Sequence, residues 1–349
     1  MNDVPGGTAS VVQQGSIGDL RLENGAVLPD VVIGYVTRGR FAPDGRNAVL
    51  VTHGYTSGPR MIEPRTASGE GSWSGLVGPG AAIDTDRWFV ISMNMIGSSY
   101  GSTGPASTNP ATGRRYGPDF PDISVGDIVA AERAFLEKLD VTHLVAVIGP
   151  SYGGTQAFQW AVNYPDFMDA VIPVVSSPRA RAGNLQMLID ELARDPNWNG
   201  GAYYDRGGML ETMTELRKAT LRTYGVETHL ARKFPDPAER EARLLELARG
   251  WAREFDPNSL VVLRRASLRF NVEPLFWCIR APLLYVLSQT DVLFPPSLAP
   301  GVMAGLKAAG VDAEYFEIES ELGHHASGAA WQKWAPKLRA FLARVAAAR

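Results

Sequence analysis

The stretch Gly149-Pro150-Ser151-Tyr152-Gly153-Gly154 joins a short apolar run, Leu144–Ile148, to a segment of helical spacing that begins near Tyr152. It matches the pattern Gly-x-Ser-x-Gly, in which the serine occupies a sharp turn from a buried strand into a helix. Small flanking residues leave room for that turn, and the serine hydroxyl is left exposed. The N–H of Tyr152, at the start of the helix, then points towards an oxyanion that forms beside the serine. We therefore interpret Ser151 as a nucleophile.

Runs typical of buried strands alternate with segments of helical spacing on both sides of this turn. The expected strands are Asp30–Thr37, Ala48–His53, Trp88–Met93, Leu144–Ile148, Ala170–Val175, Leu283–Ser288 and Ala313–Ile318. The expected helices are Ser124–Leu139, Tyr152–Asn163, Ser297–Ala309 and Trp331–Ala347. This alternation predicts an α/β fold with a mainly parallel sheet of about eight strands, flanked by helices on both faces.

Residues 179–277 interrupt the alternation. They are rich in Arg, Leu, Glu and Met, and their apolar side chains recur at helical spacing. We interpret them as a helical cap, or lid, inserted into a core domain formed by residues 1–178 and 278–349. The alternative is that these helices are part of the core. Residues 54–87 form a long loop after a strand, and loops of that length are usually functional or disordered.

A serine hydroxyl needs a general base, and the base needs an acid that orients it. After a turn of this kind the chain order is serine, acid, histidine. Asp291 follows the sixth expected strand, and the adjacent His324 and His325 follow the seventh. All three therefore lie at the carboxyl ends of strands, on the same edge of the sheet as Ser151. Spacing alone leaves both histidines open as the base.

A second oxyanion donor is expected from the loop after an early strand. His53-Gly54 closes such a strand, so the N–H of the following Tyr55 is the candidate donor. His53 precedes the serine and is better interpreted as a residue that shapes this loop, while His143 and His229 are interpreted as structural or exposed. Neither His143 nor His229 has a carboxylate or cysteine at metal-ligand spacing, and we expect no metal site.

Composition argues against several other classes of function. The chain has 349 residues with 34 Lys and Arg against 37 Asp and Glu, and this net charge of -3 argues against a nucleic-acid or anionic-membrane surface. The single cysteine, Cys278, excludes an internal disulfide framework and a multi-cysteine metal cluster. No apolar run approaches the ~20 residues of a membrane span, and residues 1–7 do not begin like a signal peptide. We expect a soluble, cytoplasmic protein with no nucleic-acid or membrane partner.

These residues resemble those of the homoserine O-acetyltransferase family, which has the α/β-hydrolase fold. The likeness covers nearly the whole chain. Its most specific stretch is Asn94-Met95-Ile96-Gly97-Ser98-Ser99-Tyr100-Gly101-Ser102-Thr103-Gly104-Pro105. Other matching stretches are the serine turn with the helix that follows it, the run Asp291-Val292-Leu293-Phe294-Pro295-Pro296, and Glu319-Ser320 before Gly323-His324.

Matched residue by residue, the resemblance implies Ser151 as the nucleophile, Asp291 as the acid and His324, rather than His325, as the base. It implies the same two oxyanion amides that the chain order suggests. It also implies an acyl-serine intermediate, a helical lid that forms a narrow tunnel, and a homodimer through the lid helices.

Two positions depart from the family in ways that concern the substrate. The residue after the catalytic histidine is usually an aspartate that pairs with the amino group of homoserine, whereas here it is His325, which carries no permanent negative charge. The family also has a lid arginine that binds the homoserine carboxylate. Met213 aligns with that position, and Arg217, one helical turn further on, is a candidate replacement. Losing a charge-assisted partner costs ~1.5–3 kcal/mol, so the acyl chemistry is better supported than homoserine as the acceptor.

We expect a serine-dependent acyl-transfer enzyme for a small ester or thioester, either an ester hydrolase or a promiscuous acyltransferase. The alternative is an O-acetyltransferase that moves the acetyl group of acetyl-CoA to homoserine or a related amino-acid alcohol. A remote alternative is a non-catalytic protein that binds a ligand in the same pocket. None of these needs a permanently bound cofactor, since acetyl-CoA would be a substrate.

Overall fold

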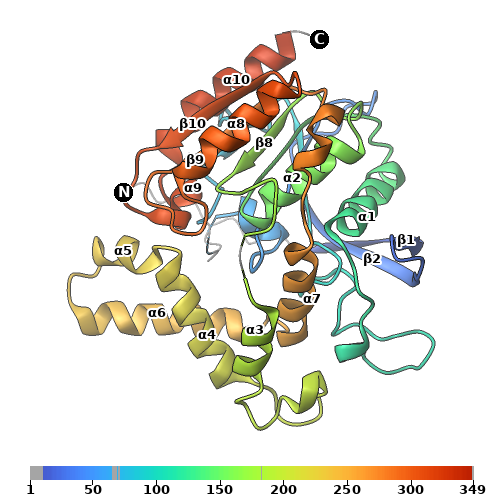
Figure 1. The fold of residues 1–349 in the computed structure, drawn as a ribbon, viewed down its shortest axis with the longest axis vertical. Helices are drawn as coiled ribbons and strands as arrows, with labels where there is room; N and C mark the ends of the chain where they lie inside the picture. The colour runs from blue at the N-terminus through green and yellow to red at the C-terminus, as the bar shows by residue number, and fades with distance from the viewer. Residues whose placement is uncertain (1–10, 65–68, 70, 182, 348–349) are drawn as a thin grey trace.

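A computed structural model describes residues 11–64, 69, 71–181 and 183–347, so the expectation about residues 1–7 concerns a part of the chain outside the described residues. Its centre is an eight-stranded sheet with the strand order β1-β2-β6-β3-β7-β8-β9-β10 (Figure 1). These strands are β1 (Gln13–Arg21), β2 (Val27–Arg38), β3 (Ala48–Val51), β6 (Phe89–Met93), β7 (Leu144–Pro150), β8 (Val171–Val174), β9 (Leu283–Ser288) and β10 (Ala313–Ile318). The strands β6, β3, β7, β8, β9 and β10 run parallel to one another, which confirms the predicted α/β fold.

The first two strands form an antiparallel hairpin at one edge, and β1 was not among the expected strands. Most of β1 is exposed or half-buried, so its sequence lacks the apolar alternation of a buried strand. Gly15 is nevertheless required there, since a Cβ atom at this position would lie 2.4 Å from the ring of Phe135. A glycine inside a strand marks such close approaches.

The two faces of the sheet carry separate apolar layers. In β9, Leu283, Tyr285 and Leu287 join one cluster of buried side chains, while Leu284 and Val286 join the other. This alternation is the period-two pattern of a strand buried on both faces. The first layer is covered by the helices α1 (Val125–Lys138), α2 (Tyr152–Asn163) and α8 (Ala299–Ala308), and it also includes Val262 and Leu263 of a later helix. The second is covered by α10 (Ala335–Ala347) and by the loop between β3 and β6, which contains the short pair β4 (Val77–Gly78) and β5 (Ile83–Asp84).

Helix boundaries follow local signals. Helix α1 begins at a capping box in which Ser124 and Asp127 each bind the other's backbone N–H. The last two expected helices are shorter than predicted, because each is preceded by a separate 3-10 turn, Pro296–Leu298 before α8 and Trp331–Lys333 before α10.

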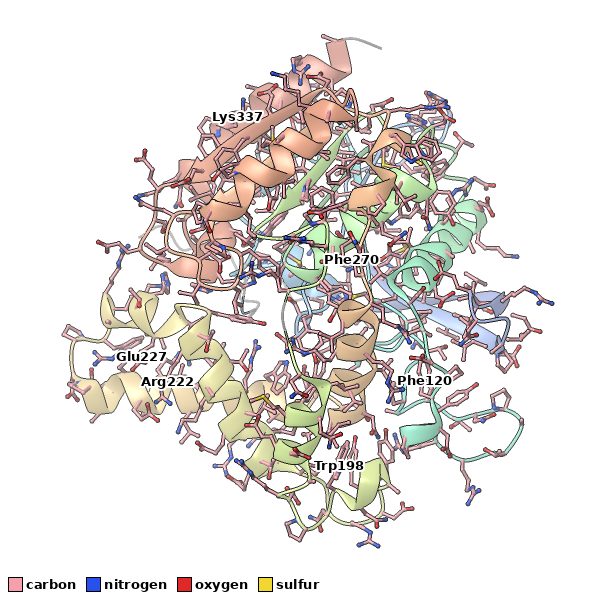
Figure 2. The ribbon with its side chains drawn as sticks, viewed as in Figure 1. Phe120, Trp198, Arg222, Glu227, Phe270 and Lys337 are labelled. Atoms are coloured by element: carbon pink, nitrogen blue, oxygen red, sulfur yellow. The ribbon has the colours of Figure 1, made fainter. Side chains whose placement is uncertain are left out.

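Five helices lie between β8 and β9 in the chain and pack together below the sheet in Figure 1. They are α3 (Leu185–Leu192), α4 (Leu210–Thr223), α5 (Val226–Ala231), α6 (Pro237–Ala252) and α7 (Pro257–Leu268). We call residues 179–277 the helical insertion. Its two ends pair with each other, since the N–H of Ala180 binds the carbonyl of Phe270 and the N–H of Val272 binds that of Pro178. Phe270, labelled in Figure 2, therefore lies where the chain leaves the insertion. The division into core and cap domains remains a prediction.

Among the described residues, no helix is both long enough and apolar enough to cross a membrane.

Candidate active site

Ser151 occupies the strained turn that the sequence pattern predicts. It lies between β7 and α2 with φ 57° and ψ -120°, a conformation that side-chain-bearing residues rarely adopt. Its N–H donates to the carbonyl of Val174 in β8 at 2.8 Å, and its own carbonyl accepts from the N–H of Thr155 at 3.0 Å. The sheet and the first turn of α2 therefore hold the strain in place.

The glycines around Ser151 are explained by close backbone packing. A Cβ on Gly149 would lie 2.1 Å from Oγ1 of Thr52, and one on Gly153 would lie 2.4 Å from the carbonyl oxygen of the same threonine. A Cβ on Gly154 would lie 2.4 Å from that of Ser176. The turn is thus pressed against the end of β3 and the segment after β8, and only glycine fits at these three positions.

The predicted acid and base are brought together at the edge of the sheet where Ser151 lies. Oδ2 of Asp291, just after β9, is 2.8 Å from Nδ1 of His324, which lies in a 3-10 turn after β10. Oδ1 of Asp291 accepts from the N–H groups of Leu293 at 2.8 Å and Phe294 at 3.2 Å. Ser151, Asp291 and His324 are 5%, 2% and 0% exposed, so the site is shielded from water.

The environment of this pair favours an ionised acid. Burial by itself raises the pKa of Asp291, but His324 and the two backbone N–H groups outweigh it, and the pKa is lowered from its usual 3.8. The imidazole of His324 packs against two rings, with its centroid 4.8 Å from that of Tyr224 and 5.7 Å from that of Phe294. The carboxylate and the rings together fix the plane of the imidazole.

The residues predicted to supply the two oxyanion donors lie at the ends of neighbouring strands. Tyr152 begins α2 directly after Ser151, and Tyr55 follows the end of β3, which pairs with β7. His53 supports this loop as expected: its Nδ1 lies 2.9 Å from the carbonyl of Gly54, and its Nε2 accepts from the N–H of Met95 at 3.3 Å. The proton therefore lies on Nδ1, and burial lowers the pKa of His53 to about 4, so the ring is neutral at pH 7.

Arg217 of α4 brings a buried cation to the same loop. It is 1% exposed, and its Nη1 donates to Oγ1 of Thr56 at 2.7 Å. Its guanidinium lies 4.8 Å from the ring centre of Trp251, whose indole N–H donates to the carbonyl of Thr56 at 2.9 Å. Met213, one turn earlier on α4, belongs to an apolar cluster against which Tyr55 and Tyr100 also pack. The structure thus joins Arg217 to the loop after β3, which we call the oxyanion loop, by a hydrogen bond, whereas Met213 is linked to that loop through apolar packing.

His325 is buried beside the candidate base but faces other groups. Its Nδ1 lies 3.3 Å from the carbonyl of Gly69, and its ring centroid is 5.1 Å from that of His229 on α5. Burial, followed by the nearby His229, lowers the pKa of His325 to about 3, so this side chain is neutral at neutral pH.

The junction of α4 and α5 directly supports residues 320–325, which we call the histidine loop. The carbonyl of Tyr224 accepts from the N–H of His325 at 2.8 Å. Gly225 has φ +88°, and a Cβ there would lie 2.4 Å from the carbonyl oxygen of Leu322. Tyr224 and Phe294, which hold the ring of His324, were not predicted as site residues. Phe294 lies inside the family-like run that begins at Asp291, whereas nothing near Tyr224 in the sequence indicates its role.

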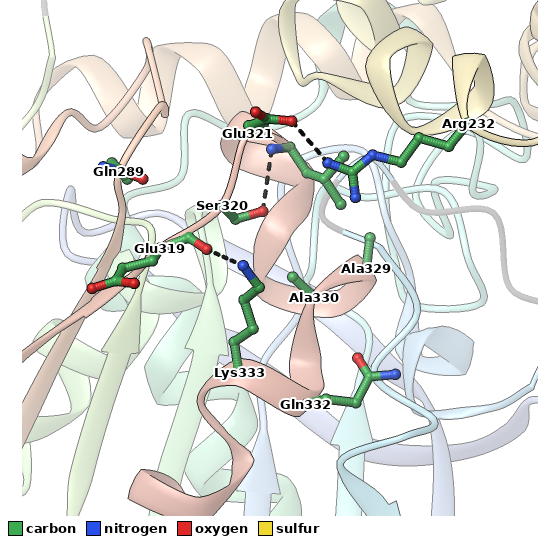
Figure 3. A pocket seen from close by; sticks show the side chains of 10 residues that line it. Arg232, Gln289, Glu319, Ser320, Glu321, Ala329, Ala330, Gln332 and Lys333 are labelled. Carbon is green, nitrogen blue, oxygen red and sulfur yellow. Dashed lines mark hydrogen bonds and ion pairs between the residues drawn. The ribbon is translucent and has the colours of Figure 1, made fainter.

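A pocket of about 480 Å³ lies outside this arrangement, beside the segment that leads to the histidine loop (Figure 3). Its lining includes Arg232, which pairs with Glu321 at 3.1 Å, and Lys333, which bonds to the carbonyl of Glu319. Neither Ser151 nor the Asp291–His324 pair lines it. Over the described ranges, no group of three or more His, Cys, Asp or Glu side chains could hold a metal ion.

The sheet topology and this edge define the class of protein. Residues 47–327 match the family described as the alpha/beta hydrolase fold, and the chain is an α/β hydrolase. Within that class it belongs to the homoserine O-acetyltransferase family, since its similarity to members of that family extends over most of the chain.

The similar proteins include both acetyltransferases and esterases. The homoserine O-acetyltransferase of Geobacter sulfurreducens is 36% identical to this protein over 94% of this chain and 95% of its own. The crystal structure of esterase E22 matches with a TM-score of 0.82 at 28% identity, covering 95% of this chain and 99% of that one. The homoserine O-acetyltransferase from Bacillus anthracis has the same TM-score at 27% identity, with 95% and 96% covered. These relatives support an acyltransferase or an esterase.

Proposed function

We propose that this protein is a serine acyl-transfer enzyme that acts on a small ester or thioester through an acyl group carried on Ser151. The observation that carries the proposal is the buried Asp291–His324 pair, 2.8 Å apart, at the edge of the sheet where Ser151 is held with φ 57°. An ionised carboxylate on Nδ1 leaves Nε2 of the histidine as the atom that exchanges protons with the reacting groups.

In the proposed reaction, the Oγ of Ser151 attacks the substrate carbonyl carbon while Nε2 of His324 takes its proton. The negative charge that forms on the carbonyl oxygen is stabilised by the N–H groups of Tyr55 and Tyr152. The bond to the leaving alcohol or thiol then breaks, and His324 returns the proton to it. Water or an acceptor alcohol attacks the acyl-serine with the same base, which releases the acid or the new ester.

Two features favour hydrolysis or broad acyl transfer over transfer to an amino acid. His325 stands where family members carry an anionic aspartate, and its lowered pKa keeps it neutral rather than charged. Met213, aligned with the arginine of the family, is apolar and packed within the insertion. A cationic ammonium group therefore gains no charged partner from His325.

A second candidate is the acetyl-CoA-dependent transfer to homoserine or a related amino-acid alcohol. It is favoured by Arg217, whose fully buried guanidinium lies on the oxyanion loop through Thr56. A buried arginine suits a substrate carboxylate, because the planar guanidinium can bind both oxygens.

Labelling and turnover test the main proposal. A fluorophosphonate probe should modify Ser151 in the wild-type protein, and Ser151→Ala should lose both labelling and the hydrolysis of p-nitrophenyl acetate. Ser16→Ala, on the distant edge strand β1, is the control and should keep both. Full activity in the Ser151→Ala variant would exclude the acyl-serine mechanism.

A second assay separates the two candidates. Coenzyme A released from acetyl-CoA is measured with and without homoserine, and free acetate is separated from O-acetyl product. Release that does not depend on homoserine supports the hydrolase, whereas release that requires it supports the acetyltransferase.

A further inference from the structure

Tyr55 and Tyr152 are joined through their side chains as well as through their proposed roles. Their rings stack with centroids 6.0 Å apart and planes 19° apart. The hydroxyl of Tyr55 donates to the carbonyl of Leu260 at 2.5 Å, and the hydroxyl of Tyr152 donates to that of Leu263 at 3.2 Å. We call Tyr55 and Tyr152 the tyrosine pair. Two chain segments that are distant in sequence are therefore attached to one helix, α7.

The two accepting carbonyls lie on one face of α7, which we call the platform. Leu260 and Leu263 are three residues apart on α7 and so lie on the same face of the helix. Arg264, the next residue, places its guanidinium 5.4 Å from the ring centre of Tyr55. Burial raises the pKa of Tyr55 to about 12, against the opposing effect of this guanidinium, so the phenol is a neutral hydrogen-bond donor at pH 7.

The platform is itself fixed to the core at both ends. Before its first turn, the N–H of Asp256 donates to Oγ of Ser99 at 2.9 Å. After its last turn, Arg269 pairs with Asp122 and donates to the carbonyl of Ile123 at 2.8 Å. Helix α7 can therefore act as a rigid reference for the residues that bind to it.

We propose that the tyrosine pair positions the oxyanion site, with each phenol setting the place of its own backbone N–H by binding to helix α7. This inference rests on the proposed function, because the two N–H groups matter only if an oxyanion forms at Ser151. The two donors belong to different segments, the loop after β3 and the start of α2, so their separation depends on contacts that both segments share. Stabilisation of an oxyanion requires donors at 2.7–3.1 Å, and small displacements weaken it steeply.

The test uses Tyr55→Phe, Tyr152→Phe and the double variant, which remove the hydroxyls and retain the rings. We expect kcat to fall about tenfold in each single variant and up to about 100-fold in the double variant, which is the lower limit for losing an oxyanion donor outright. KM should stay within about twofold of wild type. The affinity for a phosphonate transition-state analogue should fall by the same factor as kcat, because the analogue presents the same charge.

The control is Tyr315→Phe. Tyr315 lies in β10 and donates its hydroxyl to Oε2 of Glu317 at 2.9 Å, so this variant loses a tyrosine hydrogen bond in the sheet rather than on α7. It should keep its kcat. An equal fall in kcat for the control, or a rise in KM with unchanged kcat in the double variant, overturns the proposal.

Labelling distinguishes failure of the inference from failure of the proposed function. If the fluorophosphonate does not modify Ser151 in the wild-type protein, the acyl-serine mechanism fails, and the role of the tyrosine pair fails with it. If Ser151 is modified while the double variant keeps the wild-type kcat and analogue affinity, only the role of the tyrosine pair is refuted.

Discussion

Replacing Gly153 by alanine tests whether the serine turn is held by close backbone packing. The new Cβ would lie 2.4 Å from the carbonyl oxygen of Thr52 and 2.8 Å from its carbonyl carbon. Ordinary contacts begin at 3.4 Å, so the start of α2 and the end of β3 must separate by about 1 Å. The obstacle is main chain on both sides, and no side chain can rotate away to relieve it.

The cost of this shift has two parts. Overpacking costs ~1–3 kcal/mol, and alanine in a helix recovers ~1 kcal/mol of it, so we expect a net loss of up to about 2 kcal/mol. An unfolding entropy of about 2.1 cal/mol/K per residue over this chain converts a loss of about 2 kcal/mol into a fall in Tm of roughly 3 °C. A displacement of about 1 Å between nucleophile and oxyanion donors should lower kcat about 100-fold.

Calorimetry and the hydrolysis of p-nitrophenyl acetate measure the two effects on the same samples. Gly250→Ala, in α6, is the matched control, because a Cβ there meets nothing within 4 Å. This variant should gain up to ~1 kcal/mol in stability and keep its kcat. A Gly153→Ala protein with wild-type Tm and wild-type kcat would refute the packing argument.

Two buried ionisable groups yield predictions for the pH dependence of stability. The unfolded chain protonates His325 below pH 6.5, whereas in the folded protein its pKa is about 3, so the wild type should lose ~1.4 kcal/mol per pH unit as the pH falls below 6.5. His325→Asn keeps a hydrogen-bond donor for the carbonyl of Gly69. Between pH 7 and pH 5 its free energy of unfolding, measured in urea, should fall by about 2 kcal/mol less than that of the wild type. Equal falls in the two proteins would contradict this. Glu132 is 1% exposed and accepts from Trp160 at 2.7 Å, and burial, against this hydrogen bond, raises its pKa to about 8. Its folded-state pKa lies above the unfolded value of 4.5, so wild-type stability falls as the pH rises from 4.5 to 8. Between pH 4.5 and pH 7 the free energy of unfolding of Glu132→Gln should therefore rise by ~3 kcal/mol relative to that of the wild type. A difference that does not change with pH would show that the carboxyl is ionised in the folded protein.

The sheet and the candidate triad could be predicted because their signals are local. Ser151 lies in a turn whose glycines are dictated by packing within a few ångströms. Asp291 follows the buried apolar strand β9, and His324 follows β10, in which Glu314 and Glu317 are interspersed with apolar residues. Parallel strands bring their carboxyl ends to one edge, so the topology puts these three positions on the same edge of the sheet. The sequence alone did not choose between His324 and His325. The resemblance to the family selected His324, and the structure pairs that residue with Asp291.

Other features depend on contacts that no local pattern encodes. Strand β1 is exposed at an edge, and its glycine serves a ring on α1 rather than its own strand. Tyr224 belongs to the end of α4 and reaches the imidazole of His324 only through the packing of the insertion on the core. Arg217 was suggested by its position on a helix, but its bond to Thr56 joins residues 161 positions apart. The homodimer through the cap and the cytoplasmic location stay predictions.

The support of the histidine loop by the α4–α5 junction has a consequence for engineering. One way to change the substrate range of an enzyme of this fold is to exchange its inserted helices for those of a relative. In this protein the carbonyl of Tyr224 holds the N–H of His325, and Gly225 fits against Leu322 with no room for a side chain. An insertion taken from a relative would therefore replace the residues that contact the histidine loop. Residues 320–325 and the α4–α5 junction must be exchanged together, although they lie in two separate parts of the chain.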